Sequence, residues 1–556
     1  MSVEDGEPVP EQVPEPILGE PPALAADPIS DHASDTTVRL VGPASVPATT
    51  VPADGTGPVG GLPPEQTMAP LTAPIGGRRR FRRSMGALTA ALVALAGVGL
   101  VVAAVLTDSG VTVAHGAPPS LRLATPLLSA RRAPELVARP VAVREAQAAL
   151  APIITRLPDA SCVLVTDGST VLAESASTVP LAPASNTKLL TASAALSVLG
   201  ADTRLSTKVL AAGAPVDGRI AGDLYLVGGG DPLLATATAS SLMQHGQEPT
   251  TSLETLANQV VAAGVRRVDG SVVGDGSRYD DQRKVPTWPD RFIQQGTVAN
   301  LGGLVVNDSW SVDPVNPKGP AGTAVADPAA GSAAAFTALL RARGVQITGA
   351  PAAGLAPEGS VEVTAIPSLP IKDIVGQMLT FSDNTTAEML VKEMAVHGGG
   401  VGSTDGGIRV LVADLATRGL PTEGLELHDG SGLSRENRVT CRLIDAVLAA
   451  DGPNGVIAQR LARPGRPGTL DDRFTGGPLT DRIAAKTGTL NDVAALSGWL
   501  TTTPGRPVTF SVLLNPAGRS VQAADLALIG RLLGALLPYP STPPPDQLAP
   551  LPPVAS

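Results

Sequence analysis

The stretch from Pro183 to Gly200 reads PASNTKLLTASAALSVLG and places a serine and a lysine three residues apart before an apolar run. The run predicts a buried helix that begins near Thr187 and ends at Gly200. Residues three positions apart share one face of a helix, so Ser185 and Lys188 are expected to lie side by side. A serine hydroxyl becomes an effective nucleophile when a neighbouring base takes its proton. A lysine amine is such a base only when burial or a second cation lowers its pKa.

Two further short motifs contain residues suited to the same chemistry. Ser382-Asp383-Asn384 opens a predicted helix, where a hydroxyl could pass a proton and an amide could orient a peptide; capping of that helix is the alternative explanation. Lys486-Thr487-Gly488-Thr489 precedes a predicted strand. An edge strand of this composition can hold a carboxylate and let a substrate backbone approach closely, and a polar turn is the alternative.

The lysines of this chain are rare. Only seven of its 41 basic residues are lysines, and two of them stand in these motifs. Arginine is effectively never deprotonated, whereas lysine shifts its pKa readily. Lysine therefore appears at the two places, Lys188 and Lys486, where proton transfer would require an amine.

The ordered set SNTK, SDN and KTG resembles the signature of penicillin-binding proteins and serine β-lactamases. Residues 189–381 separate the first two motifs, which leaves room for an inserted module. Such an insertion is similar to the low-molecular-mass class C penicillin-binding proteins, the D-alanyl-D-alanine carboxypeptidase/endopeptidase family. Further stretches that resemble this family between about residues 140 and 537 are GDLYLVGGGDPLL, SDNTTAEML, DGSGLSRENRVT and AAKTGTLNDVAALSGW.

The resemblance implies a serine D-Ala-D-Ala carboxypeptidase/endopeptidase that acts on peptidoglycan peptide stems and is acylated by β-lactam antibiotics. The implied roles are nucleophile for Ser185, base for Lys188, proton relay for Ser382, amide binding for Asn384, suppression of the Lys188 charge for Lys486, carboxylate binding for Thr487, and an oxyanion hole from the N–H groups of Ser185 and Thr489. The implied fold is mixed α/β (α+β), a transpeptidase-like sheet flanked by helices and interrupted by a β-rich insert. No metal or other cofactor is expected.

Two other function classes compete with this interpretation. A class A β-lactamase would add a Glu-x-x-x-Asn motif for deacylation, and no glutamate between Asn384 and Lys486 has asparagine four residues on. A non-catalytic wall-binding protein would not need the retained lysines. A nucleic-acid binder is disfavoured because the net charge is −10. The sequence leaves open the preference for carboxypeptidase or endopeptidase activity, the role of the insert and the oligomeric state.

The N-terminal part differs in composition from the rest. Residues 1–77 contain eleven acidic residues and one basic residue, many prolines and no aromatic residue, which predicts a disordered tail. Five arginines in residues 78–83 then precede an uncharged apolar run from Gly86 to Leu106. At about 1.5 Å per residue this run spans a bilayer, and the arginines place its N-terminal side in the cytoplasm. A cleaved signal peptide starting at Met68 and a buried core helix are the alternatives.

The expected organisation follows from these observations. The expected segments are a cytoplasmic tail at 1–77, the basic flank and transmembrane anchor at 78–107, a spacer at 108–135, a discontinuous catalytic domain at 136–204 and 356–537, an inserted β-rich module at 205–355, and a disordered Pro-rich tail at 538–556. The catalytic domain is thus expected outside the cytoplasm, where Cys162 and Cys441 are free to form a disulfide; two free thiols are the alternative.

Overall fold

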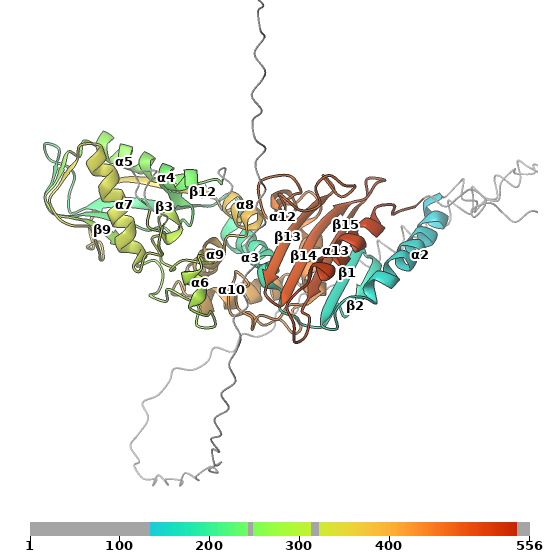
Figure 1. Ribbon diagram of the computed structural model, residues 1–556. Coiled ribbons are helices and arrows are strands. Elements are labelled where there is room, and N and C mark those ends of the chain that lie inside the picture. Colours follow the sequence, from blue (N-terminus) through green and yellow to red (C-terminus); the bar gives the residue numbers. More distant parts are fainter. Residues whose placement is uncertain (1–133, 243–247, 313–321, 542–556) are drawn as a thin grey trace, which may run out of the picture. The chain divides into compact units, whose positions relative to one another are not determined.

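The computed structural model describes residues 134–242, 248–312 and 322–541 (Figure 1). The predicted anchor and N-terminal tail lie outside these residues. Within the described ranges, none of the helices combines the length and the apolar character needed to span a membrane. The described part begins with helix α2 (Pro134–Ile154), whose first residues fall at the end of the expected spacer.

The catalytic domain is built on an antiparallel sheet with the strand order β13-β14-β15-β1-β2. The strands are β1 (Ser161–Asp167), β2 (Thr170–Ser175), β13 (Ile483–Leu490), β14 (Val493–Thr501) and β15 (Pro507–Leu514). β1 and β2 form the hairpin that the sequence predicts around an Asp-Gly turn. The two ends of the domain meet in this sheet, because β1 pairs with β15 along its whole length.

Both faces of this sheet are covered by helices, which explains why its strands are apolar at successive positions. In β1, Val163 and Val165 face one core with α2 and α13 (Ala523–Leu536). Cys162 and Leu164 face the other core, which is built from the helices listed next. These helices are α3 (Thr187–Ala195), α8 (Ile371–Phe381), α9 (Asn384–His397), α10 (Thr404–Thr417), α11 (Cys441–Asp451) and α12 (Val456–Arg460).

The insert has its own mixed sheet with the strand order β11-β9-β5-β3-β12. Its strands are β3 (Arg204–Ala211), β5 (Leu224–Val227), β9 (Val272–Asp275), β11 (Ala352–Ala353) and β12 (Val361–Pro370). A second, three-stranded sheet is formed by β4 (Arg219–Ile220), β8 (Arg267–Val268) and β10 (Gln346–Ile347). A two-stranded sheet is formed by β6 (Leu234–Ala235) and β7 (Thr251–Ser252). Helices α4 (Ala237–Leu242), α5 (Leu253–Ala262), α6 (Arg291–Gln294) and α7 (Pro328–Ala342) also belong to it, so it is mixed rather than only β-rich.

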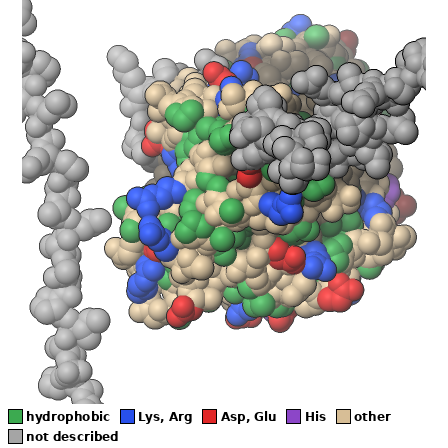
Figure 2. All heavy atoms as spheres, turned by 90° about the vertical axis from the view of Figure 1, so that its right-hand side faces the viewer, with side chains coloured by type: hydrophobic (Ala, Val, Ile, Leu, Met, Phe, Trp, Pro, Cys, Tyr) green, Lys and Arg blue, Asp and Glu red, His purple; other side chains and the backbone are tan. Residues whose placement is uncertain are grey.

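Two expected boundaries differ from those observed. Strand β12 follows the expected end of the insert at residue 355, yet it pairs with β3 in the sheet of the insert. At the C-terminus, the Pro-rich tail was expected from residue 538, but Tyr539 is buried and donates its hydroxyl to Asp167 at 2.9 Å. In both cases a long-range contact, which composition does not encode, extends the folded part. Away from these cores, acidic and basic side chains are interspersed with apolar ones on the face shown in Figure 2.

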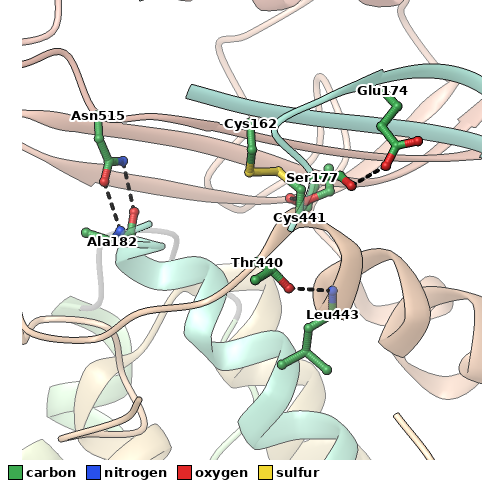
Figure 3. The surroundings of a disulfide bond; sticks show 10 residues. Cys162, Glu174, Ser177, Ala182, Thr440, Cys441, Leu443 and Asn515 are labelled. Carbon is green, nitrogen blue, oxygen red and sulfur yellow. Dashed lines mark hydrogen bonds between the residues drawn. A yellow bond between two sulfur atoms is a disulfide. The ribbon is translucent and has the colours of Figure 1, made fainter. Parts of the chain in front are cut away.

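Cys162 and Cys441 form a disulfide that joins β1 to the first residue of α11 (Figure 3). Both side chains are fully buried. Beside it, Thr440 caps α11 by accepting a hydrogen bond from the Leu443 N–H at 3.0 Å. The bond links residues 279 positions apart, so it holds the sheet against the helical core.

We expect loss of this disulfide to lower the free energy of unfolding by about 2–4 kcal/mol, because a cross-link over a long loop restricts the unfolded chain. The measurement is thermal unfolding of the wild type with and without reductant. The matched control is the double variant Cys162→Ala/Cys441→Ala, whose unfolding should not respond to reductant. Two titratable thiols in the non-reduced, denatured wild type would contradict the bond itself.

Candidate active site

Ser185 lies in the 3₁₀ turn η1 (Ala184–Asn186), directly before helix α3. The turn is tightly enclosed. A Cβ added to Gly432 would stand 1.9 Å from the carbonyl oxygen of Ala184, so only glycine permits this close approach. The serine side chain is half-buried, whereas every residue of α3 is buried. The nucleophile candidate therefore stands on a rigid base with its hydroxyl accessible.

Lys188 is fully buried, and its amine contacts three oxygens. Nζ lies 3.3 Å from Ser185 Oγ, 2.6 Å from Asn384 Oδ1 and 2.7 Å from the carbonyl oxygen of Ser431. The carbonyl and the Oδ1 atom only accept hydrogen bonds. A neutral amine has two hydrogens and one lone pair, so these two acceptors take both hydrogens and the lone pair is left for the serine hydroxyl.

The burial of Lys188 also changes the pKa of its amine. Loss of solvation lowers the pKa of Lys188 to about 8, although the carboxyl groups of Asp429, Glu388 and Asp383, where ionised, act in the opposite direction. A lysine on the protein surface would be almost entirely protonated near neutral pH. At this depth a usable fraction of Lys188 is neutral, which is what a general base requires.

Asn384 is the first residue of α9, and its amide orientation is determined by the insert. Nδ2 donates to the carbonyl oxygen of Thr297 at 2.7 Å, which leaves Oδ1 facing Lys188. Asp383 caps α9, since its carboxylate accepts the N–H of Thr386 at 2.9 Å. The capping explanation is thus correct for the aspartate of this motif, while the asparagine contacts the lysine.

Ser382 and Lys486 form the second polar pair of the site. Lys486 Nζ donates to Ser382 Oγ at 2.8 Å and to the carbonyl oxygen of Thr487 at 2.9 Å. Ser382 ends α8 with a left-handed backbone (φ 64°), a conformation that costs a non-glycine residue about 1–3 kcal/mol. The surrounding contacts maintain this strained backbone, and the hydrogen bond from Lys486 ties the hydroxyl to strand β13.

Lys188 and Lys486 are both buried, and both have lowered pKa values. Burial lowers the pKa of Lys486 well below its usual value, and the charge of Lys188 lowers it further. Burial is also the largest cause of the lowered pKa of Lys188. Because repulsion between two ammonium groups is mutual, the role of Lys486 in keeping Lys188 neutral stays a prediction, to which the structure adds the desolvation of both amines.

Strand β13 brings the third motif to the nucleophile. A Cβ on Gly488 would lie 3.0 Å from both Asn186 Nδ2 and the carbonyl oxygen of Pro183, so the glycine lets the strand pass against η1. Thr487 is nearly buried and Thr489 is exposed beside it. Ser382 and Asn384 also line a cavity of about 750 Å³ that extends along the insert.

All seven expected site residues thus lie on elements that converge on Ser185. The motifs did not indicate the carbonyl groups of Ser431 and Thr297, because any residue supplies a backbone carbonyl. The stretch DGSGLSRENRVT, which contains Ser431, was a usable signal because it resembles the family, but the resemblance assigned it no role in the site. Glu388 was a second usable signal, because it stands one helical turn after Asn384 in the sequence.

This chain is similar to known proteins in sequence and in fold. A model of the D-Ala-D-Ala carboxypeptidase 3 (S13) family matches residues 146–321 and 311–530. A carboxypeptidase of Mycobacterium tuberculosis is 33% identical over 62% of this chain and 73% of its own length. A D-alanyl-D-alanine carboxypeptidase of an Actinomadura species is 30% identical over 63% and 77%. The crystal structure of penicillin binding protein 4 from Haemophilus influenzae has a similar mixed α/β fold, with a TM-score of 0.59 and 22% identity over 69% of this chain and 98% of that one.

Proposed function

Because the chain belongs to the D-Ala-D-Ala carboxypeptidase 3 (S13) family, we propose that Ser185 is the nucleophile acylated during its reaction. The enzyme is a penicillin-binding, serine-type D-Ala-D-Ala carboxypeptidase/endopeptidase that acts on peptidoglycan peptide stems. The observation that carries the assignment is the environment of Lys188. Its Nζ lies within hydrogen-bonding distance of Ser185 Oγ, Asn384 Oδ1 and the Ser431 carbonyl. In the neutral amine the latter two acceptors take both hydrogens, which leaves the lone pair for the Ser185 hydroxyl.

Acylation then proceeds as follows. Lys188 takes the proton of Ser185 as Oγ attacks the carbonyl carbon of the penultimate D-alanine. The oxyanion is stabilised by the N–H groups of Ser185 and Thr489. The C–N bond breaks as the proton that Lys188 took from Ser185 passes through the Ser382 hydroxyl to the nitrogen of the departing D-alanine, which returns Lys188 to the neutral amine. The Ser382 hydroxyl is also hydrogen-bonded to Lys486. Water hydrolyses the acyl-enzyme and restores Ser185.

The remaining site residues bind the peptide. One N–H of Asn384 Nδ2 is used by Thr297, so the other is available for a carbonyl of the peptide stem. Thr487 and Lys486 hold the terminal carboxylate. A D-alanine is on the acyl side of both the terminal bond and the cross-link, so the same groups serve carboxypeptidase and endopeptidase reactions.

The test is intact-mass spectrometry of the purified protein after exposure to benzylpenicillin, followed by peptide mapping. We expect one added penicillin, located on Ser185, and release of D-alanine from a pentapeptide stem. A folded protein whose mass does not change would contradict the proposal. Turnover of nitrocefin at many cycles per second would instead favour the β-lactamase alternative, and digestion of cross-linked muropeptides would measure endopeptidase activity.

We also propose that residues 86–106 anchor the enzyme in the cell membrane, with the catalytic domain outside the cytoplasm. The support is the uncharged apolar run after five arginines. Fractionation of cells should place the full chain in the membrane, resistant to extraction at high pH. A soluble exported form whose N-terminus follows the apolar run would instead demonstrate signal cleavage.

A further inference from the structure

Glu388 lies one turn after Asn384 on α9 and is linked to Lys188 through Ser431. Its side chain is fully buried. Oε1 accepts the N–H groups of Gly430 and Ser431 at 3.0 and 2.7 Å. Ser431 in turn presents its carbonyl oxygen to Lys188 Nζ at 2.7 Å. Helix α9 therefore supplies one acceptor of the lysine directly, through Asn384, and fixes the other through Glu388.

A second buried carboxyl group, that of Asp429, lies in the same turn. It accepts four N–H donors, from Gly432, Ser434, Asn437 and Trp288 of the insert, which is the pattern of an ionised carboxylate. Among the described residues, Glu388 Oε2 has no hydrogen-bond partner. The two N–H donors on Oε1 favour the ionised form, whereas burial, an Oε2 atom without a donor and the nearby carboxyl group of Asp429 favour the neutral acid. Burial has the largest effect, so the balance favours the neutral acid.

We propose that Glu388 is a positioning residue for acylation and that it acts as the neutral acid, holding the Ser431 carbonyl on Lys188 without adding a second negative charge beside Asp429. This inference rests on the proposed role of Lys188 as the base. An ionised Glu388 would stabilise the ammonium form of Lys188 and so withhold the lone pair from Ser185.

The charged groups around this position support the same conclusion. Burial and the charge of Asp429 raise the pKa of Glu388 to about 8. Lys188 faces Glu388 from α3, and both carboxyl groups together with Asp383 oppose deprotonation of the lysine. Lys486 approaches Lys188 from β13. As the pH rises, a Glu388 that loses its proton becomes negatively charged. This charge stabilises the ammonium form of Lys188, so that Lys188 loses its own proton only at a higher pH.

The decisive variant is Glu388→Gln, which keeps an acceptor for Gly430 and Ser431 but cannot ionise. Its acylation rate at high pH should stay within about threefold of the wild type. The midpoint of the rise in rate with pH should move down by about half a unit or more, because Lys188 then titrates without a competing carboxyl group.

Two further variants separate positioning from general stability. Glu388→Ala removes the acceptor of two buried N–H groups, and acylation should fall at least about tenfold at every pH. Glu393→Gln is the matched control. Glu393 is a buried carboxylate on the same helix, but it pairs with Arg278 and Tyr279 of the insert, so its loss should leave the pH midpoint unchanged.

A wild-type measurement tests the neutral acid even if the variants fold poorly. In protein labelled with ¹³C at glutamate carboxyl groups, one resonance should titrate above about pH 7. The inference is overturned if every glutamate is already ionised at pH 6, or if Glu388→Gln keeps the wild-type midpoint. Absence of any acylation in the wild type would refute the proposed function itself, whereas normal wild-type acylation with either of these results refutes only this inference.

Discussion

Replacing Lys188 with methionine is expected to slow acylation of Ser185 by about 10³-fold, the scale of a lost general base. Methionine has a similar unbranched shape and no titratable group. It removes the lone pair that faces Ser185 Oγ and leaves Asn384 Oδ1 and the Ser431 carbonyl without a donor. The measurement is the second-order rate of labelling by a fluorescent penicillin.

The chain offers a matched control in Lys392, which lies on α9 and is fully buried like Lys188. Its amine forms an ion pair with Asp280 and a hydrogen bond to the carbonyl oxygen of Gln282, both in the insert. Lys392→Met should lower the thermal stability, because it leaves a partly buried carboxylate unpaired. Its labelling rate per folded molecule should stay within about threefold of the wild type. Equal losses in both variants would show that Lys188 acts only through stability.

The second large effect expected is on the pH dependence of acylation. The base works only as the neutral amine, and burial lowers the pKa of Lys188 to about 8. Below this value the neutral fraction falls tenfold for each pH unit, and above it the fraction approaches one. Acylation at pH 6 should therefore be about 100-fold slower than on the plateau above pH 9.

This profile is measured between pH 6 and 10 as the second-order labelling rate at penicillin concentrations below saturation. Circular dichroism at each pH checks that the protein stays folded. An unperturbed lysine would place the midpoint near pH 10.4. A midpoint there would mean that water reaches the amine. A flat profile across the range would mean that another group takes the serine proton.

Much of the site could be predicted because it depends on local spacing. Ser185 and Lys188 meet since three residues along a helix bring two side chains together, and the structure places them 3.3 Å apart. The hairpin of β1 and β2, and helices α8 and α9, likewise follow from short-range patterns of apolar and turn residues. The rarity of lysine indicated which amines were retained for chemistry.

Other parts could not be predicted, because no local pattern encodes them. The end of the insert depends on the pairing of β12 with β3, and the burial of Tyr539 depends on its contact with Asp167. The disulfide was one of two open alternatives until the fold brought Cys162 and Cys441 together. The motifs reveal that Lys188 and Lys486 carry amines but not how deeply the fold buries them, and this burial is the largest cause of their lowered pKa values.

By itself the sequence determined which reactive groups the protein carries and their order along the chain. Only the tertiary structure decided what those groups do to one another. The two acceptors that orient Lys188 come from residues 196 and 243 positions away, and the insert supplies the carbonyl of Thr297 that orients Asn384. The physical reason is that the lowered pKa of an amine and the direction of its lone pair depend on burial and hydrogen-bond partners, which arise when distant segments pack.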